Sequence, residues 1–166
     1  TTGVFVGSAE IIEISAIKVR NNEVVNEFSS LINPHCHIPA EATAVNHITD
    51  DMVKDAPSLS DVIDSFLIFV ADDVIVGYNN AAFDMNILYD SIYELKDIPF
   101  RNNYIDLLHA SRRSIIGLPN YKLETICKYY GINTEGEHRA LKDCYLTKEC
   151  YDRLYDEYGN LAFQKS

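Results

Sequence analysis

The sequence has neither a long apolar run nor a compact cluster of cysteines, and each absence removes a class of protein. A membrane-spanning helix needs about 20 consecutive apolar residues, and no such stretch is present. The four cysteines, Cys36, Cys127, Cys144 and Cys150, form no C-x-x-C pair. A structural zinc site needs tighter spacing than this. We therefore expect reduced thiols packed inside a cytoplasmic protein, without a membrane partner.

Positive charge is also scarce. The chain has 14 Lys and Arg residues against 25 Asp and Glu residues, so its formal net charge is −11 at pH 7. Because Lys and Arg normally drive binding to phosphate, this balance argues against tight, independent binding of long duplex DNA. A nucleic-acid enzyme of this composition would need metal ions that bridge an acidic site to phosphate, or a partner that delivers the strand.

What is present is sufficient for one folded domain, residues 1–166. The chain is 47% hydrophobic, which is too apolar for a disordered chain and enough for a sizeable core. Residues 10–20 and 23–33 are rich in Ile and Val and are separated by Asn21-Asn22, a pattern typical of a β-hairpin. Helices and short strands then alternate, so we expect an α/β domain with a mixed sheet.

The other expected elements follow in order along the chain. They are an irregular segment at 34–39, a short helix at 39–46, a turn at 49–52, a helix from Ser58 to about Val70, a strand at 73–77, a helix from Asp84 to about 97, a strand at 104–106, and helices at 107–113, 121–130 and from about 139 onward. Asp61 follows Ser58 by three residues, which predicts a partial capping box. Gly131 is expected to end its helix as the C′ residue.

The last long helix carries a carboxylate on an apolar face. Positions at helical spacing form one stripe: Ala140, Asp143, Leu146, Thr147, Cys150 and Leu154. Because these residues are mostly apolar or small, we expect Asp143 on the buried side, where an unpaired carboxylate is strongly disfavoured. His138 lies just before the helix. A buried carboxylate with a histidine nearby indicates a divalent cation as the partner.

A second helix repeats this pattern. Asp84 follows a polar turn and shares a helical face with Ile87, Leu88, Ser91 and Leu95. For a single Asp, an ordinary first-turn residue favoured by the helix dipole is the more common explanation. Two such carboxylates, one with a histidine before it, favour a metal site.

The segment His35-Cys36-His37 is another candidate for metal binding. Two histidines at this spacing can share a metal ion. No carboxylate pair accompanies them in the sequence. We therefore expect an ordinary surface loop.

Taken together, these motifs resemble those of the DEDDh 3′–5′ exonucleases, the family of the proofreading epsilon subunit of bacterial DNA polymerase. The second family motif ends in Phe-Asp after a short Asn/Ala run, and residues 80–84 are similar to it. The third motif, H-x-A-x-x-D, is matched by residues 138–143. Residues 38–50, 104–107 and 121–127 also resemble family segments. The resemblance covers almost the whole chain in the right order.

The resemblance implies a ribonuclease-H-like α/β fold with a five-stranded mixed sheet flanked by helices. The first family motif is D-x-E-T-T-G, and its last three residues match Thr1-Thr2-Gly3. The resemblance thus places the motif's Asp and Glu, and the central strand that carries them, just upstream of Thr1. A sheet without its central strand would leave two neighbours with unpaired backbone groups. We therefore expect residues to precede Thr1; a chain that began there would be inactive and poorly folded.

The implied activity is metal-dependent removal of nucleotides from single-stranded 3′ ends, as in proofreading or repair. DNA is the expected substrate, and RNA stays open because RNA-trimming relatives use the same residues. The resemblance implies two divalent ions, Mg²⁺ or Mn²⁺, with Asp84 and Asp143 as ligands. It assigns His138 as the general base that deprotonates the attacking water. Its implied partners are a single-stranded 3′ end and a DNA polymerase subunit.

Further residues are expected at the nucleotide. Thr1 and Thr2 match motif residues that meet the terminal nucleotide. His47 and Phe83 are candidates for lining its pocket, although Phe83 could equally be a core residue and His47 a helix cap. The absence of D-x-E leaves an alternative open, a catalytically inactive module that binds strand ends or associates with a polymerase.

Two positions near the motifs have a different expected role. Asn79 stands where many relatives have His, which should alter hydrogen bonding around the site and leave the chemistry unchanged. Asp106 lies at a strand end, and we expect it to be structural.

Overall fold

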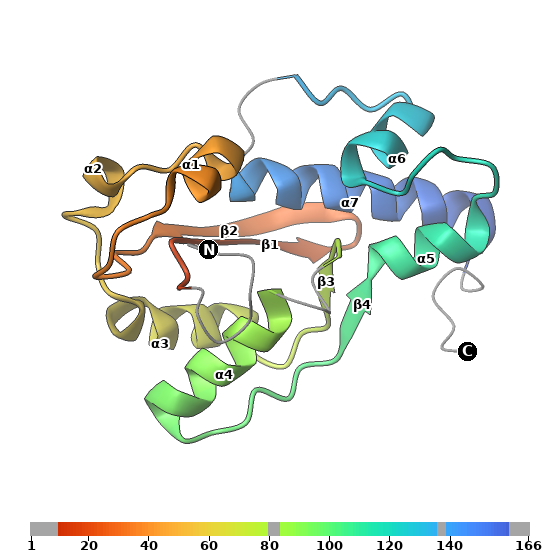
Figure 1. Ribbon diagram of the computed structural model, residues 1–166. Helices are drawn as coiled ribbons and strands as arrows, with labels where there is room; N and C mark the ends of the chain where they lie inside the picture. The colour runs from red at the N-terminus through yellow and green to blue at the C-terminus, as the bar shows by residue number, and fades with distance from the viewer. Residues whose placement is uncertain (1–9, 80–83, 136–138, 160–166) are drawn as a thin grey trace.

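The computed structural model describes residues 10–79, 84–135 and 139–159, with Asp84 described by its backbone alone (Figure 1). The elements, in chain order, are β1 (Glu13–Arg20), β2 (Glu23–Leu31), α1 (Ala40–Asn46), α2 (Asp50–Val53), α3 (Leu59–Val70), β3 (Ile75–Gly77), α4 (Asp84–Lys96), β4 (Tyr104–Asp106), α5 (Leu107–Ser114), α6 (Leu123–Tyr129) and α7 (Ala140–Tyr158). The order of elements predicted from the sequence is confirmed, except that the turn expected at 49–52 is the short helix α2. The first three strands are shorter than expected, and β4 has the predicted bounds. No helix among the described residues is both long and apolar enough to cross a membrane.

The β1–β2 hairpin turns at two consecutive asparagines. Asn21 and Asn22 have φ angles of 50° and 65°, which is the left-handed region that the two central residues of a type I′ turn require. Asn tolerates this region better than most residues because its short side chain can bond locally. The strands pair antiparallel from Glu13 opposite Leu31 to Arg20 opposite Glu23, with a register shift between Lys18 and Val19.

The described strands form two separate sheets. β1 pairs with β2, and β3 pairs in parallel with β4, with Ile75 opposite Tyr104. The predicted five-stranded sheet is therefore not confirmed, since the described residues supply four strands. The remaining strand was predicted to lie upstream of Thr1, outside the described residues, so that part stays a prediction. Helix α7 contacts both β1 and β3 and thereby connects the two sheets.

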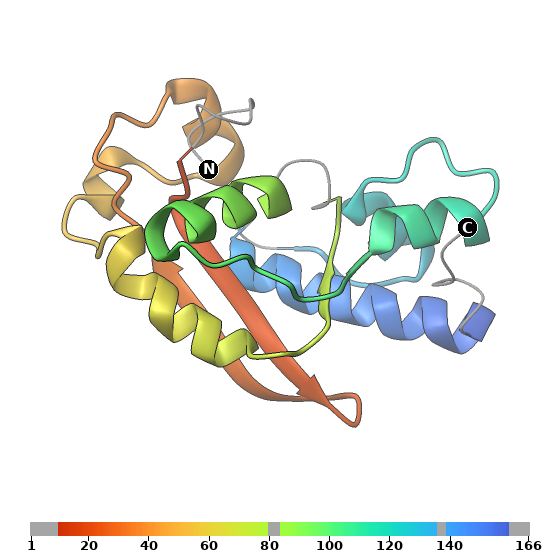
Figure 2. The same cartoon turned by 90° about the horizontal axis from the view of Figure 1, so that it is seen from below.

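The two faces of the hairpin carry different helices. Figures 1 and 2 show α3 and α4 on one face and α7 on the other. Because strand side chains alternate between faces, Ile14 and Ala16 of β1 point together, and both pack against the main hydrophobic core. Phe28, opposite Ala16 in β2, joins the same core. The buried members of this core include Ile11, Ile32, Val62, Ile63, Phe66, Met85, Ile87, Leu88 and Ile92.

A second core lies between α5, α6 and α7. It contains Leu107, Ala110, Ile115, Ile126, Cys127, Leu146, Cys150 and Leu154. The thiol sulfurs of Cys127 and Cys150 lie 3.5 Å apart within it, and all four cysteines of the chain are free. A smaller cluster of Ile12, Ile38, Ile48 and Val53 fixes α1 and α2 beside the start of β1.

The predicted apolar stripes are confirmed in large part. On α7, Leu146, Thr147, Cys150 and Leu154 are buried, whereas Ala140 and Asp143 are half-buried. On α4, Ile87 and Leu88 are buried as predicted. The prediction for Leu95 is wrong, because its side chain is 42% exposed. The buried face of α4 runs instead through Met85 and Ile92, and the last turn lies at the surface.

The predicted cap of α3 is confirmed. Ser58 is the N-cap residue, and it forms a capping box with Asp61. The Ser58 amide donates to the Asp61 carboxylate at 3.0 Å. Hydrogen bonds from the hydroxyl and the amide of Ser58 lower the pKa of Asp61.

Candidate functional site

Most of the predicted site residues, catalytic and substrate-binding together, lie outside the described part of the chain. Thr1, Thr2, Phe83 and His138 are not described, and only the backbone of Asp84, the first residue of α4, is described. His47 is the C-cap of α1, with φ of 59°, and is exposed. Its amide donates to the Thr43 carbonyl at 2.8 Å. The backbone of His47 thus caps α1, which is the alternative role considered for this residue. A role for His47 at a nucleotide stays a prediction.

Asp143 occupies the first turn of α7 and is half-buried. Its amide donates to the Arg139 carbonyl at 3.1 Å, which is the first turn of helical bonding. Burial, followed by the charges of Asp143 and Glu13, raises the pKa of the neighbouring Cys144 thiol to about 11. The Cys144 thiol also lies 3.4 Å from the Ser15 carbonyl oxygen, so the beginning of α7 faces β1.

Glu13 of β1 holds the first residues of α7. One carboxylate oxygen accepts from the Nε and a terminal nitrogen of Arg139, at 3.1 and 2.7 Å. The other oxygen accepts from the Ala140 amide at 3.2 Å. The side chain of Arg139, the N-cap residue, makes no capping bond to its own helix. Glu13 thus supplies an acceptor and a negative charge at the helix N-terminus, where both are favourable.

Lys142 holds the segment that leads into the same helix. Its ammonium group donates to the carbonyl oxygens of Thr134 and Glu135, at 2.6 and 2.5 Å. Hydrogen bonds from a charged donor are stronger than neutral ones. The backbone on both sides of residues 136–138 is therefore fixed by charged side chains.

Asp106 holds Asn79, the last described residue before α4. This carboxylate is 8% exposed and accepts from the amides of Asn79 and Leu108, at 3.0 and 2.9 Å. The bond to Leu108 caps α5. Asn79 has φ of 55°, a conformation that Asn tolerates well. These contacts agree with the structural role expected for Asp106, and they fix the backbone just before the second motif.

The residues available for a metal ion are carboxylates and a histidine. Within the described ranges, no three His, Cys, Asp or Glu side chains form a group that could hold a metal. The predicted ligands Asp84 and Asp143 offer carboxylate oxygens, which suit Mg²⁺ and Mn²⁺. The donor chemistry thus fits the implied ions, and the half-burial of Asp143 agrees with a carboxylate that has a partner.

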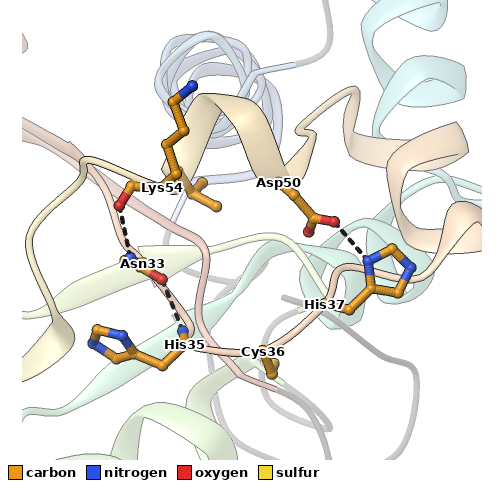
Figure 3. Close-up of a pocket in the computed structure, with 7 residues that line it drawn as sticks. Asn33, His35, Cys36, His37, Asp50 and Lys54 are labelled. Carbon is orange, nitrogen blue, oxygen red and sulfur yellow. Dashed lines mark hydrogen bonds and ion pairs between the residues drawn. The ribbon is translucent and has the colours of Figure 1, made fainter.

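The loop around Cys36 is irregular and exposed, as predicted. It lines a hollow together with Asn33, Asp50, Val53 and Lys54 (Figure 3). His35 and His37 point in different directions there, and His37 Nδ1 lies 2.6 Å from Asp50. The Ile38 amide and then His37 lower the pKa of Asp50. None of the predicted site residues lines this hollow.

The sequence did not reveal the contacts of Glu13 and Lys142. A signal for Glu13 was present, since it is the one acid in the run Ile11-Ile12-Glu13-Ile14. Its side chain is only 10% exposed, and such a carboxylate requires a partner. Lys142 gave no such signal, because a lysine on a helix is ordinary.

Comparison with known proteins identifies the family. Residues 1–151 match the family model RNase_T, described as exonuclease. The chain is 31% identical to the DNA polymerase III subunit epsilon of Aquifex aeolicus over 156 residues, which are 94% of this chain and 77% of that protein. It is 35% identical to the PolC-type DNA polymerase III of Oceanobacillus iheyensis over 161 residues, which are 95% of this chain and 11% of that protein. The chain thus spans about a tenth of the PolC relatives that it matches.

Solved structures agree on the fold. Exonuclease X in complex with 5′ overhanging duplex DNA is 28% identical, with a TM-score of 0.72 and coverage of 89% of this chain and 84% of that one. The nuclease domain of 3′hExo, a DEDDh family member bound to rAMP, superposes with a TM-score of 0.76 at 17% identity, over 95% of this chain and 86% of that one. The ribonuclease-H-like α/β class expected from the sequence is therefore confirmed. By its family model and its relatives, the chain belongs to the exonuclease family, among the DEDDh 3′–5′ exonucleases similar to the epsilon subunit of DNA polymerase III.

Proposed function

We propose that residues 1–166 form one exonuclease domain that removes nucleotides from single-stranded 3′ ends, with DNA as the substrate. The observation that carries this proposal is the start of α7. The helix begins at Ala140, inside the H-x-A-x-x-D motif, and the motif's Asp143 is half-buried next to β1. The choice of DNA as the substrate is supported by relatives that are named for DNA, namely DNA polymerase III subunits and an exonuclease X–DNA complex.

In this proposal Asp84 and Asp143 would hold two Mg²⁺ or Mn²⁺ ions. Such ions, when bound, supply a hydroxide nucleophile and stabilise charge at phosphorus. His138 takes the proton from the attacking water, a task for which an imidazole with an ordinary pKa of about 6.5 is suited. The acidic chain itself contributes little attraction for phosphate, so the bound ions supply the local positive charge.

The remaining predicted residues would bind the strand end. Thr1 and Thr2 would contact the terminal nucleotide, and His47 and Phe83 would line its pocket. A polymerase would deliver this end, as the relationship to PolC and epsilon proteins supports. A domain that works with the replication polymerase would act in the cytoplasm.

A nuclease assay tests the proposal directly. The protein, with its N-terminus verified by intact mass, is incubated with single-stranded DNA and RNA of the same sequence, in Mg²⁺ or Mn²⁺. We expect successive loss of nucleotides from the 3′ end of the DNA, and EDTA should stop it. Asp143→Asn and His138→Ala should abolish steady-state turnover, because each removes a required group.

The outcomes separate the assigned roles. Full activity in either variant would contradict the role given to that residue. Binding of the strand end without turnover, even in Mn²⁺, would contradict the catalytic proposal as a whole. Faster degradation of RNA than of DNA would reverse the substrate assignment alone.

A further inference from the structure

His138 stands between two backbone segments that are each fixed by a charged side chain. Before it, Lys142 donates to the carbonyls of Thr134 and Glu135. After it, Glu13 accepts from the side chain of Arg139 and the amide of Ala140. Consecutive Cα atoms are about 3.8 Å apart across a trans peptide, so fixing a residue restricts the positions open to its neighbour.

The hydrogen bonds that Glu13 accepts constrain the direction of the chain as well as its position. Arg139 meets one carboxylate oxygen through two nitrogens, and the Ala140 amide meets the other. Three bonds to one rigid group fix both the position and the direction of the chain, since hydrogen bonds weaken steeply when misaligned. Glu13 itself projects from a paired strand, opposite Leu31, so the anchor rests on a regular element.

Stability alone is a weak explanation for this carboxylate. Its side chain is 10% exposed and sits in an otherwise apolar run. The cost of desolvating an ion pair can exceed its Coulombic gain, and a hydrophobic replacement is often as stable. A shape-matched apolar residue could fill the position, but it could not hold Arg139 and Ala140 in place.

We propose that Glu13 and Lys142 are positioning residues for His138. They fix the described backbone on each side of the histidine, Thr134 and Glu135 before it and Arg139 and Ala140 after it, and its action as general base depends on both. This inference rests on the proposed function, in which His138 is the general base. Neither residue touches the substrate in this role; both act through the histidine.

The first test is steady-state kinetics on 3′-labelled single-stranded DNA in Mg²⁺, with the intact protein. Glu13→Gln and Lys142→Met should each lower kcat by about 10- to 100-fold, because misplacing a general base by about 1 Å has an effect of this size. KM should be unchanged, since strand binding does not involve either residue. Lys142→Arg, which keeps the charge and the donors, should recover most of kcat.

Matched controls lie on the same hairpin and the same helix. Glu27 of β2 accepts from the Tyr145 hydroxyl further along α7, and Lys148 pairs with Asp152 at 2.5 Å within the helix. Glu27→Gln and Lys148→Met remove the same charges away from the histidine, so kcat should be unchanged. Thermal unfolding of every variant shows whether a loss of kcat follows a loss of folded protein.

The deciding measurement repeats Glu13→Gln and Lys142→Met in a His138→Ala background. Single-turnover rates with excess enzyme and long incubation capture the slow residual reaction. If the two residues act through His138, the second substitution should cause no further loss. An equal loss in both backgrounds would overturn the inference while leaving the proposed function intact. Full activity of His138→Ala alone would instead overturn the general-base role, and the positioning role with it.

Discussion

The two faces of the β1–β2 hairpin are built from different chemistry. Ile14, Ala16 and Phe28 face α3 and α4 and belong to the main core. On the other face, Glu13 and Glu27 bind residues of α7, and the Ser15 carbonyl accepts from Cys144 at 3.4 Å. Because side chains alternate along a strand, Glu13 and Glu27 project from the face opposite to Ile14, Ala16 and Phe28.

The difference shows that the two faces of the hairpin have different roles: one stabilises the fold, and the other positions α7. Apolar burial stabilises in proportion to area and has no preferred direction, so the α3–α4 face contributes folding energy. Charge-assisted hydrogen bonds require defined distances and angles. The polar face therefore determines where α7 begins and how it lies, and α7 carries Asp143.

The largest effect is expected from breaking the apolar face. Phe28→Ala removes ring contacts with Phe66 and Phe69, whose centroids lie 5.7 and 5.6 Å away. Because a cavity remains, the free energy of unfolding should fall by about 2–4 kcal/mol. Urea unfolding measures this loss, and Val25→Ala, at a 55% exposed position of β2, should change stability by less than about 0.5 kcal/mol. A large fall in kcat per folded molecule of the Phe28 variant would contradict the division between the faces.

A smaller effect is expected on the polar face away from the helix terminus. The hydroxyls of Ser15 and Ser29 lie 2.8 Å apart across the strands. Ser15→Ala removes this bond, and the free energy of unfolding should fall by about 0.5–1 kcal/mol, since water replaces part of it. The same urea experiment tests this. A loss as large as that of Phe28→Ala would show that the polar face also carries much of the stability.

The smallest effect is expected where the end of β1 meets Asp73, in the segment after α3. Hydrogen bonding to Arg20, followed by Lys18, lowers the pKa of Asp73 from its ordinary 3.8. A lowered folded-state pKa means that the ionised carboxylate stabilises the fold above the ordinary pKa, and that this contribution is lost as pH falls through the lowered value. Asp73→Asn should therefore flatten the fall in stability between about pH 5 and pH 2. An unchanged acid slope of the unfolding free energy, measured by urea titration at each pH, would contradict the assignment.

Local elements were predictable because their causes are local. The hairpin turn was predicted from Asn21-Asn22, and the capping box from Ser58 and Asp61. The buried stripe of α7 was predicted from the spacing of Leu146, Cys150 and Leu154. The prediction failed at Leu95, because helical spacing identifies a face but not where the neighbouring core ends. The pairing of Glu13 with Arg139 joins residues 126 positions apart, so no local pattern could show it.

The sequence by itself determined the order of helices and strands, the family motifs and the residues proposed for chemistry, because each depends on neighbours along the chain. Only the tertiary structure decided that Glu13 and Lys142 bind the backbone on the two sides of the histidine segment and that Asp106 binds the Asn79 amide. It also decided that the hairpin packs one face against the main core and uses the other to bind α7. These features arise when strand alternation and helix packing bring distant charged and polar groups within hydrogen-bonding distance.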